Sequence, residues 1–174
     1  DYIRRQRQMC IRDRDRNMKS GGAKANASGQ QHENIVQLIA QRHGLETYRY
    51  KDWVKQGHPN PAIITRYPYE SIYATDGYGD AYILSGRKSI WIEAKRQTVS
   101  GSVDEKYPYV FHNMIEEWIH LADKVVVVFD GTGMKDTAVD WIKDQCREYN
   151  RMNGKKVVHA MRLHEFIPWL DKTI

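Results

Sequence analysis

The sequence has 174 residues, of which 41% are hydrophobic and 28% are charged, and its formal net charge is +5. This size and composition are typical of one globular domain with a sizeable core. They exclude a membrane-spanning protein, because no stretch approaches about 18 consecutive apolar residues. The two cysteines, Cys10 and Cys146, lie far apart, which excludes a zinc knuckle and argues against a disulfide framework.

The positive charge is concentrated at the N-terminus. Residues 1–19 contain seven Arg or Lys and three Asp, whereas the remaining 155 residues contain 20 basic and 19 acidic side chains. Residues 1–19 lack apolar periodicity and are expected to form a disordered basic tail. Two interpretations stay open. The tail is an arm that contacts phosphates, or it is an assembly artefact, because Met9–Arg14 resembles the translation of a transposon end used in sequencing libraries. The folded domain is then expected within residues 20–174, and the charged N-terminus favours a cytoplasmic location.

A first helix is expected from Ser28 onward. Ser28 and Gln31 fit a capping box, and Gly44 is placed to end the helix. Glu33 borders the apolar stripe of this helix, which is formed by Ile35, Val36, Ile39 and Ala40.

Residues 45–70 are the hardest part of the sequence to assign to regular elements. We expect a short strand at 47–50, a helical turn at 52–56 and a loop at 57–61. Arg66 is followed by Tyr67-Pro-Tyr69, a cation among aromatic rings that suits either nucleic-acid contacts or ordinary tyrosine packing along a loop. Ile72–Thr75 is expected to be a strand that leads into the next element.

The central element is a predicted β-hairpin at residues 80–95. Two apolar runs flank Gly86-Arg87, and glycine at the first position of a two-residue loop indicates a type II′ turn. This register places Asp80 opposite Glu93 and puts Lys95 on the same face as Glu93. Two carboxylates about 5 Å apart repel each other and destabilise a hairpin. The arrangement is favourable if a divalent cation such as Mg²⁺ or Mn²⁺ lies between them, and it therefore predicts a phosphodiester-cleaving site.

The rest of the chain alternates between helical and strand patterns. Residues 110–121 have helical spacing, with a second candidate capping box at Ser102 and Glu105. Lys124–Phe129 is an unbroken β-branched run, which is typical of a strand covered on both faces. A helix at 138–146, a strand at 156–161 and a helix at 165–170 follow. The order predicts a single α/β domain with a central mixed β-sheet flanked by helices, in which the strand at 125–129 lies beside residues 89–95.

Asp80 followed by Glu93-Ala94-Lys95 resembles the motif of the PD-(D/E)XK nuclease superfamily, which has a restriction-endonuclease-like core. Gln97 and the stretch Ser100–Tyr109 are similar to a phage and restriction-type branch of that superfamily, and the resemblance spans roughly residues 28–170. One departure is that Gly79 stands where the motif has proline.

The resemblance implies that Asp80, Glu93 and Lys95 are catalytic. It also implies that Asp80, Glu93, the Ala94 carbonyl and Glu33 belong to a site for Mg²⁺ or Mn²⁺. Contacts with DNA, or places beside the site, are expected for the remaining polar candidates Gln97, Lys106, Ser102, Arg96 and Arg66.

Three classes of function remain in competition. The first is a metal-dependent DNA endonuclease of restriction, phage or Holliday-junction-resolving type. It would be prokaryotic or phage-encoded and would act on double-stranded DNA, and cleavage of both strands favours a homodimer. The second is a non-catalytic DNA-binding module on the same fold. The third is a glycosidase, for which a carboxylate pair about 5 Å apart suits a retaining mechanism. Without the resemblance, Glu93 and Lys95 read as a same-face ion pair on an exposed strand.

Overall fold

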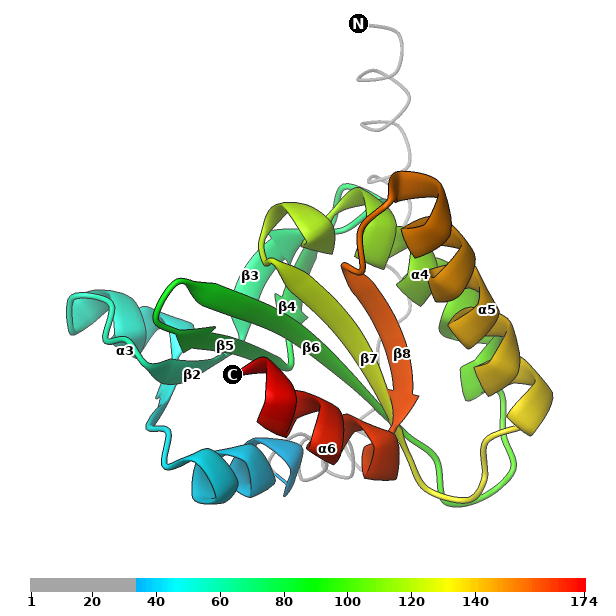
Figure 1. Ribbon diagram of the computed structural model, residues 1–174, viewed down its shortest axis with the longest axis horizontal. Coiled ribbons are helices and arrows are strands. Elements are labelled where there is room, and N and C mark those ends of the chain that lie inside the picture. Colours follow the sequence, from blue (N-terminus) through cyan, green and yellow to red (C-terminus); the bar gives the residue numbers. More distant parts are fainter. Residues whose placement is uncertain (1–33) are drawn as a thin grey trace, which may run out of the picture.

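The computed structural model describes residues 34–174. The predictions for the basic tail, for the capping box at Ser28 and for Glu33 lie outside the described residues. Within them the chain forms a single α/β domain, built on a six-stranded sheet with the order β1-β2-β5-β6-β7-β8 (Figure 1). These strands are β1 (Thr47–Arg49), β2 (Ala62–Thr65), β5 (Ala81–Ser85), β6 (Lys88–Arg96), β7 (Lys124–Asp130) and β8 (Val158–Arg162).

The sheet is mixed, as expected. β5 runs antiparallel to β2 and β6, whereas the pairs β1 with β2, β6 with β7 and β7 with β8 are parallel. Between β2 and β5 the chain makes a separate two-stranded hairpin, β3 (Tyr67–Glu70) and β4 (Asp76–Gly79). The predicted placement of 125–129 beside 89–95 is confirmed by the parallel pairing of β6 with β7.

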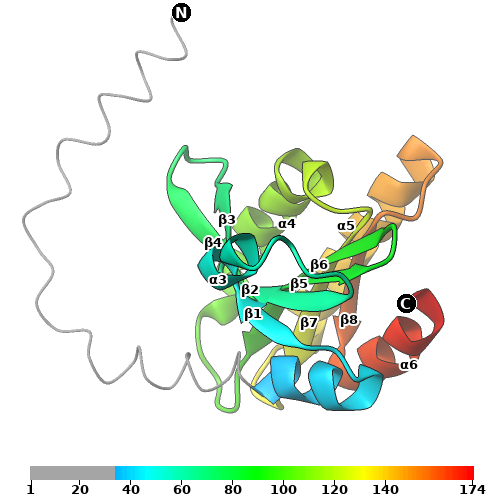
Figure 2. The same cartoon turned by 90° about the vertical axis from the view of Figure 1, so that its left-hand side faces the viewer.

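Helices cover both faces of the sheet (Figures 1 and 2). One face carries α3 (Tyr50–Lys55), η1 (Val103–Lys106), α4 (Tyr107–Glu116), η2 (Trp118–His120) and α5 (Asp136–Asn153). The opposite face carries the helical residues 34–43 and α6 (Leu163–Thr173). Within residues 34–174, no helix is long and apolar enough to cross a membrane.

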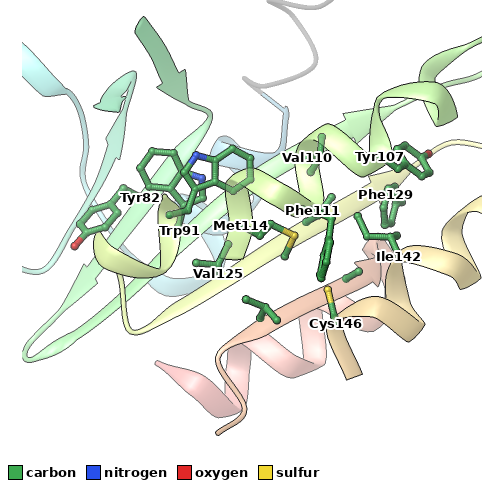
Figure 3. Packing of buried hydrophobic residues seen from close by; sticks show 14 of the residues in the cluster. Tyr82, Trp91, Tyr107, Val110, Phe111, Met114, Val125, Phe129, Ile142 and Cys146 are labelled. Carbon is green, nitrogen blue, oxygen red and sulfur yellow. The ribbon is translucent and has the colours of Figure 1, made fainter. Parts of the chain in front are cut away.

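The β-branched run in β7 explains why the sheet has two cores. Val125, Val127 and Phe129 pack toward α4 and α5, whereas Val126 and Val128 pack toward α6 and residues 35–39. Figure 3 shows Val125 and Phe129 in the first of these cores. Alternate side chains of a strand point to opposite faces, so an all-apolar strand satisfies both layers. Each of these five residues is at most 1% exposed, and β7 therefore contributes buried side chains to both cores.

The predicted register of the central hairpin is confirmed. Ala81 pairs with Ile92 and Ile83 with Ile90. Gly86 has a φ of 63°, the left-handed value that the first position of the predicted turn requires. The side chain of Asn60 holds this turn, because it donates to the Gly86 carbonyl at 2.7 Å and accepts from the Gly86 N–H at 3.0 Å.

The expected strand at Ile72–Thr75 is wrong, because these residues form the turn between β3 and β4. The Ser71 hydroxyl accepts from the backbone N–H groups of Tyr73 and Thr75, and Ala74 is left-handed with a φ of 54°. A serine that binds nearby backbone groups competes with strand pairing, and this local bonding outweighs the β-branched composition. The strand that pairs with β5 is β2 instead.

Two expectations for residues 102–121 are also wrong. Ser102 precedes η1 but makes no side-chain capping bond, so the second capping box does not form. The helical spacing predicted as far as Leu121 breaks after Glu116, where α4 ends and the short η2 segment follows. Pro108 at the start of α4 suits the first turn of a helix and marks its true beginning.

Candidate active site

Asp80, Glu93 and Lys95 lie together at one end of the β5–β6 hairpin. Tyr82 and Trp91 pack into the core beneath α4, and side chains two residues apart in a strand share a face. Asp80 and Glu93 therefore lie on that same face, above Tyr82 and Trp91.

Two hydrogen bonds define the geometry of this group. The Ala94 N–H donates to Asp80 Oδ2 at 2.7 Å, so the Asp80 carboxylate extends the β5–β6 ladder by one step, just before β5 begins at Ala81. Lys95 Nζ donates to Glu93 Oε1 at 2.5 Å. The side chains of Glu93 and Lys95 are 13% and 23% exposed, so their pairing is shielded from water but remains reachable.

The pKa values show that the three charges act on one another. Burial, followed by repulsion from Glu93, raises the pKa of Asp80 well above 3.8, and attraction to Lys95 only partly opposes this. Burial on its own would lower the pKa of Lys95, but attraction from Glu93 and Asp80 outweighs it, and the pKa is raised. Lys95 is therefore charged at neutral pH, and the ionised group holds one carboxylate in excess.

Gly79 explains the departure from the motif. A Cβ atom at this position would lie 2.5 Å from Cζ2 of the Trp91 ring, closer than real Cβ atoms approach other groups. The indole packs directly against the backbone of Gly79 and so fixes the residue that follows it, Asp80. A proline ring at position 79 would occupy the same space as the indole.

Two hollows reach the group, and the helical residues 34–40 line part of each. A groove of about 810 Å³ runs from helical residues 36–40, past Arg49 and Arg66, to Asp80. A smaller cavity of about 230 Å³ is lined by Ala94, Lys95 and Asn34, among others. Asn34 is the first described residue of its helix, next to the predicted Glu33, which lies outside the described residues.

The other predicted site residues fall into three settings. Gln97 is buried, and its backbone bonds to Asp130 and Gly133 at 3.0 and 2.9 Å tie the end of β6 to the next loop. Arg96 is exposed, with Nε 3.6 Å from Asp130 Oδ2, and Arg66 lines the groove. Lys106 and Ser102 are exposed at η1 and line neither hollow. The functional roles of all five residues stay predictions.

Several residues near the group were not singled out from the sequence. Burial raises the pKa of Tyr69, and the charges of Glu93 and Asp80 raise it further. Burial also raises the pKa of Tyr107 to about 12, while Lys95 acts to lower it. An alternating pattern in residues 67–70 could have indicated a strand with Tyr69 on its inner face, although Pro68 obscures that signal.

The model of a PD-(D/E)XK nuclease superfamily domain matches residues 24–174. The chain belongs to the PD-(D/E)XK nuclease superfamily. Comparisons with curated proteins and with solved structures gave no match. The mixed sheet flanked by helices is consistent with the restriction-endonuclease-like core of this superfamily, and membership indicates nuclease activity.

PD-(D/E)XK nucleases typically use divalent metals, and the residues present can be tested against that use. The described part of the chain has no group of three or more His, Cys, Asp or Glu side chains that could hold a metal. An ion at this site would rest on two carboxylates and backbone oxygen. The donor set fits a hard cation that keeps part of its water shell, and the excess negative charge fits a bound cation.

Proposed function

We propose that this PD-(D/E)XK protein is a metal-dependent DNA endonuclease whose catalytic residues are Asp80, Glu93 and Lys95. The observation that carries the proposal is the charge balance of the group. A largely buried carboxylate with a raised pKa is kept beside a second carboxylate, at a cost to the fold. A bound cation reverses that cost, whereas a purely structural role offers no compensation for it.

The ion would be held by the carboxylates of Asp80 and Glu93 and by the carbonyl of Ala94. The Ala94 N–H bonds to Asp80, and the N–H and C=O of one residue point to the same side of a strand. The Ala94 carbonyl is therefore expected on the side of Asp80. When bound, Mg²⁺ or Mn²⁺ would activate water and neutralise charge on the phosphate.

Lys95 would act directly on the reacting group. Its raised pKa keeps the ammonium protonated at neutral pH, and Glu93 holds it on the face that carries Asp80. An ammonium in this position stabilises the negative charge that develops on the phosphoryl oxygens, or it orients the attacking water. Trp91 and Tyr107 exclude solvent from beneath the group, since both side chains are at most 1% exposed, and this strengthens its electrostatic interactions.

The test is nicking of supercoiled plasmid DNA in Mg²⁺, in Mn²⁺ and in EDTA. We expect nicking only with metal. Asp80→Asn, Glu93→Gln and Lys95→Ala should each lower the rate by about 10³-fold or more, as expected when a group that stabilises the transition state is removed. Asp52→Asn and Lys55→Ala are the matched controls, because both residues lie exposed on α3 and should leave the rate unchanged.

DNA binding in EDTA separates the roles of the charges. Asp80→Ala removes a negative charge from the path of the phosphates, so affinity should hold or rise. Lys95→Ala removes a cation, so affinity should fall modestly and the salt slope should flatten by about one contact. If the Lys95→Ala variant cleaved at the rate of the parent, the catalytic role of Lys95 would be refuted. If the parent bound DNA without metal and never nicked it, the protein would be a non-catalytic DNA-binding module. Cleavage of both strands would favour a homodimer, because each chain supplies one such site.

A further inference from the structure

The groove that ends at Asp80 has one wall with an unusual surface. β4 contributes Tyr78, which is 50% exposed although it lies in a strand. The guanidinium of Arg66 lies over its ring, 4.3 Å from the centroid. Both residues line the groove, so one wall carries a flat cationic and aromatic platform.

The platform is fixed relative to Asp80. Arg66 has a φ of 55° and its N–H donates to the Gly79 carbonyl at 3.1 Å. Tyr78 precedes Asp80 by two residues, which corresponds to a Cα separation of about 7 Å in a strand. A group stacked on the platform would therefore lie one or two nucleotides from a phosphate held at Asp80.

The charges and rings of the groove favour a nucleic-acid strand as its occupant. Arg49 and Arg66 supply cations along its length, with Asp76 and Asp80 as the opposing carboxylates. Arginine binds phosphate oxygens in a bidentate way and stacks on planar rings. Bases within a duplex already stack on their neighbours, so only an unpaired base has a free face for a side chain.

We propose that this groove binds an unpaired DNA strand beside the cleaved phosphate, with Arg49 and Arg66 on the backbone and a base stacked on the Tyr78–Arg66 platform. The substrate class is then DNA with a single-stranded segment, such as an overhang or a branch. This inference rests on the proposed nuclease function for the position of the cleaved phosphate, but the stacking itself does not need catalysis.

The experiment measures binding by fluorescence anisotropy in EDTA. The probes are a fluorescein-labelled blunt duplex and the same duplex with a single-stranded overhang. The parent should bind the overhang probe more tightly. Tyr78→Ala should weaken binding of that probe by about ten-fold and leave the blunt probe nearly unchanged, while Tyr78→Phe, which keeps the ring, should restore most of the affinity.

Tyr73→Ala is the matched control for the ring. Tyr73 is 69% exposed on the turn of the same hairpin and stacks on Tyr109, outside the groove. Arg87→Ala, on the far turn of the β5–β6 hairpin, is the control for Arg66→Ala, which should weaken binding and flatten the salt slope by about one contact. Equal affinity of the parent for both probes, or equal behaviour of Tyr78→Ala and Tyr73→Ala, would overturn the proposal.

Plasmid nicking distinguishes failure of this proposal from failure of the nuclease function. If the parent nicks plasmid but Tyr78→Ala binds both probes as the parent does, the stacking proposal is wrong and the nuclease function stands. If the parent does not nick plasmid, but Tyr78→Ala binds the overhang probe more weakly than the parent does, the groove binds unpaired DNA and the catalytic proposal is wrong.

Discussion

Gly79 lies against the ring of Trp91, with 2.5 Å between the ring and any Cβ placed there. Trp91 is itself fully buried and stacks on Trp118 with the ring centroids 5.5 Å apart. The indole is therefore held from both sides and has little freedom to retreat. A side chain at position 79 would move the backbone instead, and Asp80 would move with it.

Gly79→Ala is expected to lower both stability and activity. Overpacking of this kind costs about 1–3 kcal/mol, and displacement of Asp80 should reduce plasmid nicking in Mg²⁺ by at least ten-fold. Gly44→Ala is the control. Gly44 has a φ of 62° with open space around it, so alanine there should cost about 1 kcal/mol through backbone strain alone and leave nicking unchanged. Urea unfolding gives the stabilities, and parental nicking by Gly79→Ala would show that Trp91 does not set the position of Asp80.

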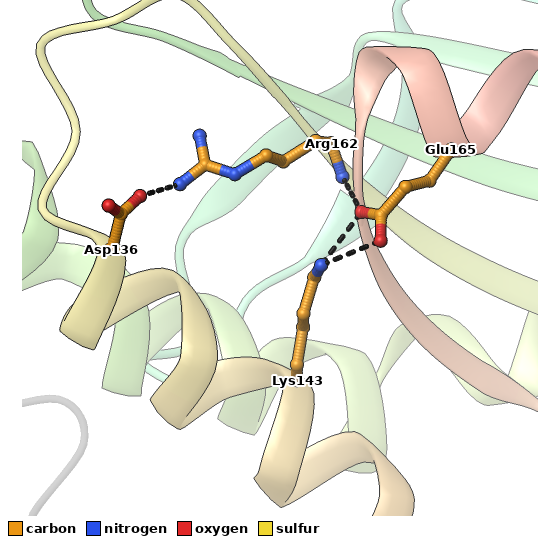
Figure 4. Close-up of polar contacts among 4 residues, drawn as sticks. All are labelled: Asp136, Lys143, Arg162 and Glu165. Carbon is orange, nitrogen blue, oxygen red and sulfur yellow. Dashed lines mark hydrogen bonds and ion pairs between the residues drawn. The ribbon is translucent and has the colours of Figure 1, made fainter.

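At the scale of elements, β8 is an edge strand whose outer side is closed by side chains. Asn150 on α5 donates to the Val158 carbonyl at 2.7 Å and accepts from the N–H groups of Val157 and Val158 at 3.0 and 3.1 Å. Glu165 accepts from the Arg162 N–H at 2.7 Å and pairs with Lys143, and the Arg162 side chain reaches Asp136 (Figure 4). An edge satisfied in this way is a poor template for another strand.

Asn150→Ala is expected to reopen this edge. Loss of its bonds leaves backbone groups of β8 unsatisfied, at a cost of about 1–3 kcal/mol, and an unprotected edge promotes self-association. Asn153→Ala is the matched control on the same helix, because Asn153 bonds only to the Tyr149 carbonyl one turn earlier. Urea unfolding and size-exclusion chromatography with light scattering measure the two effects. Equal stability of the two variants would contradict the role assigned to Asn150.

The elements differ in how far the sequence could predict them. The β5–β6 hairpin was predictable in register because Gly86 at the turn and the two apolar runs that flank it agree on one pairing. The β3–β4 hairpin was not, because Pro68 interrupts its first strand and its turn depends on the Ser71 hydroxyl and on Asn113, which accepts from the Ile72 N–H across 41 residues.

The site also has a part that the sequence could predict and a part that it could not. Asp80, Glu93 and Lys95 were singled out by the hairpin register together with the resemblance to the nuclease motif, and the position of Lys95 beside Glu93 follows from strand alternation. The groove was not visible, because it is built from residues of one helix, two sheet strands and the separate hairpin. Arg49 and Tyr78 gain their place only through tertiary packing.

At the scale of the whole molecule, the buried carboxylate makes stability depend on pH and metal. The pKa of Asp80 is raised in the folded state above its ordinary value of 3.8. A group of this kind contributes stability at low pH that is lost as the pH rises through its folded pKa. The metal-free protein should therefore carry an unfavourable charge at neutral pH, and Mg²⁺ should remove that penalty.

We expect Asp80→Asn to be more stable than the parent at neutral pH in EDTA, and this difference should shrink as the pH falls through the raised pKa of Asp80 toward 3.8. Millimolar Mg²⁺ should raise the melting temperature of the parent by binding only the folded state, and it should change Asp80→Asn little. Asp104→Asn is a control for which the opposite change in stability is expected. A hydrogen bond with Lys135 lowers the pKa of Asp104, so this variant should be less stable than the parent at neutral pH. A parent melting temperature indifferent to Mg²⁺ would count against the metal site.

The segment of residues 66–79, whose two ends lie side by side, has an evolutionary consequence. The chain leaves the sheet after Thr65 and returns at Ala81, and the bond from the Arg66 N–H to the Gly79 carbonyl joins the two ends. Exposed positions between those ends, such as Tyr78, can change without disturbing the sheet, and lengthening such a loop costs little entropy. Selection can therefore vary these exposed positions and alter which nucleic acid is held, while Gly79, Asp80, Glu93 and Lys95 are inherited unchanged.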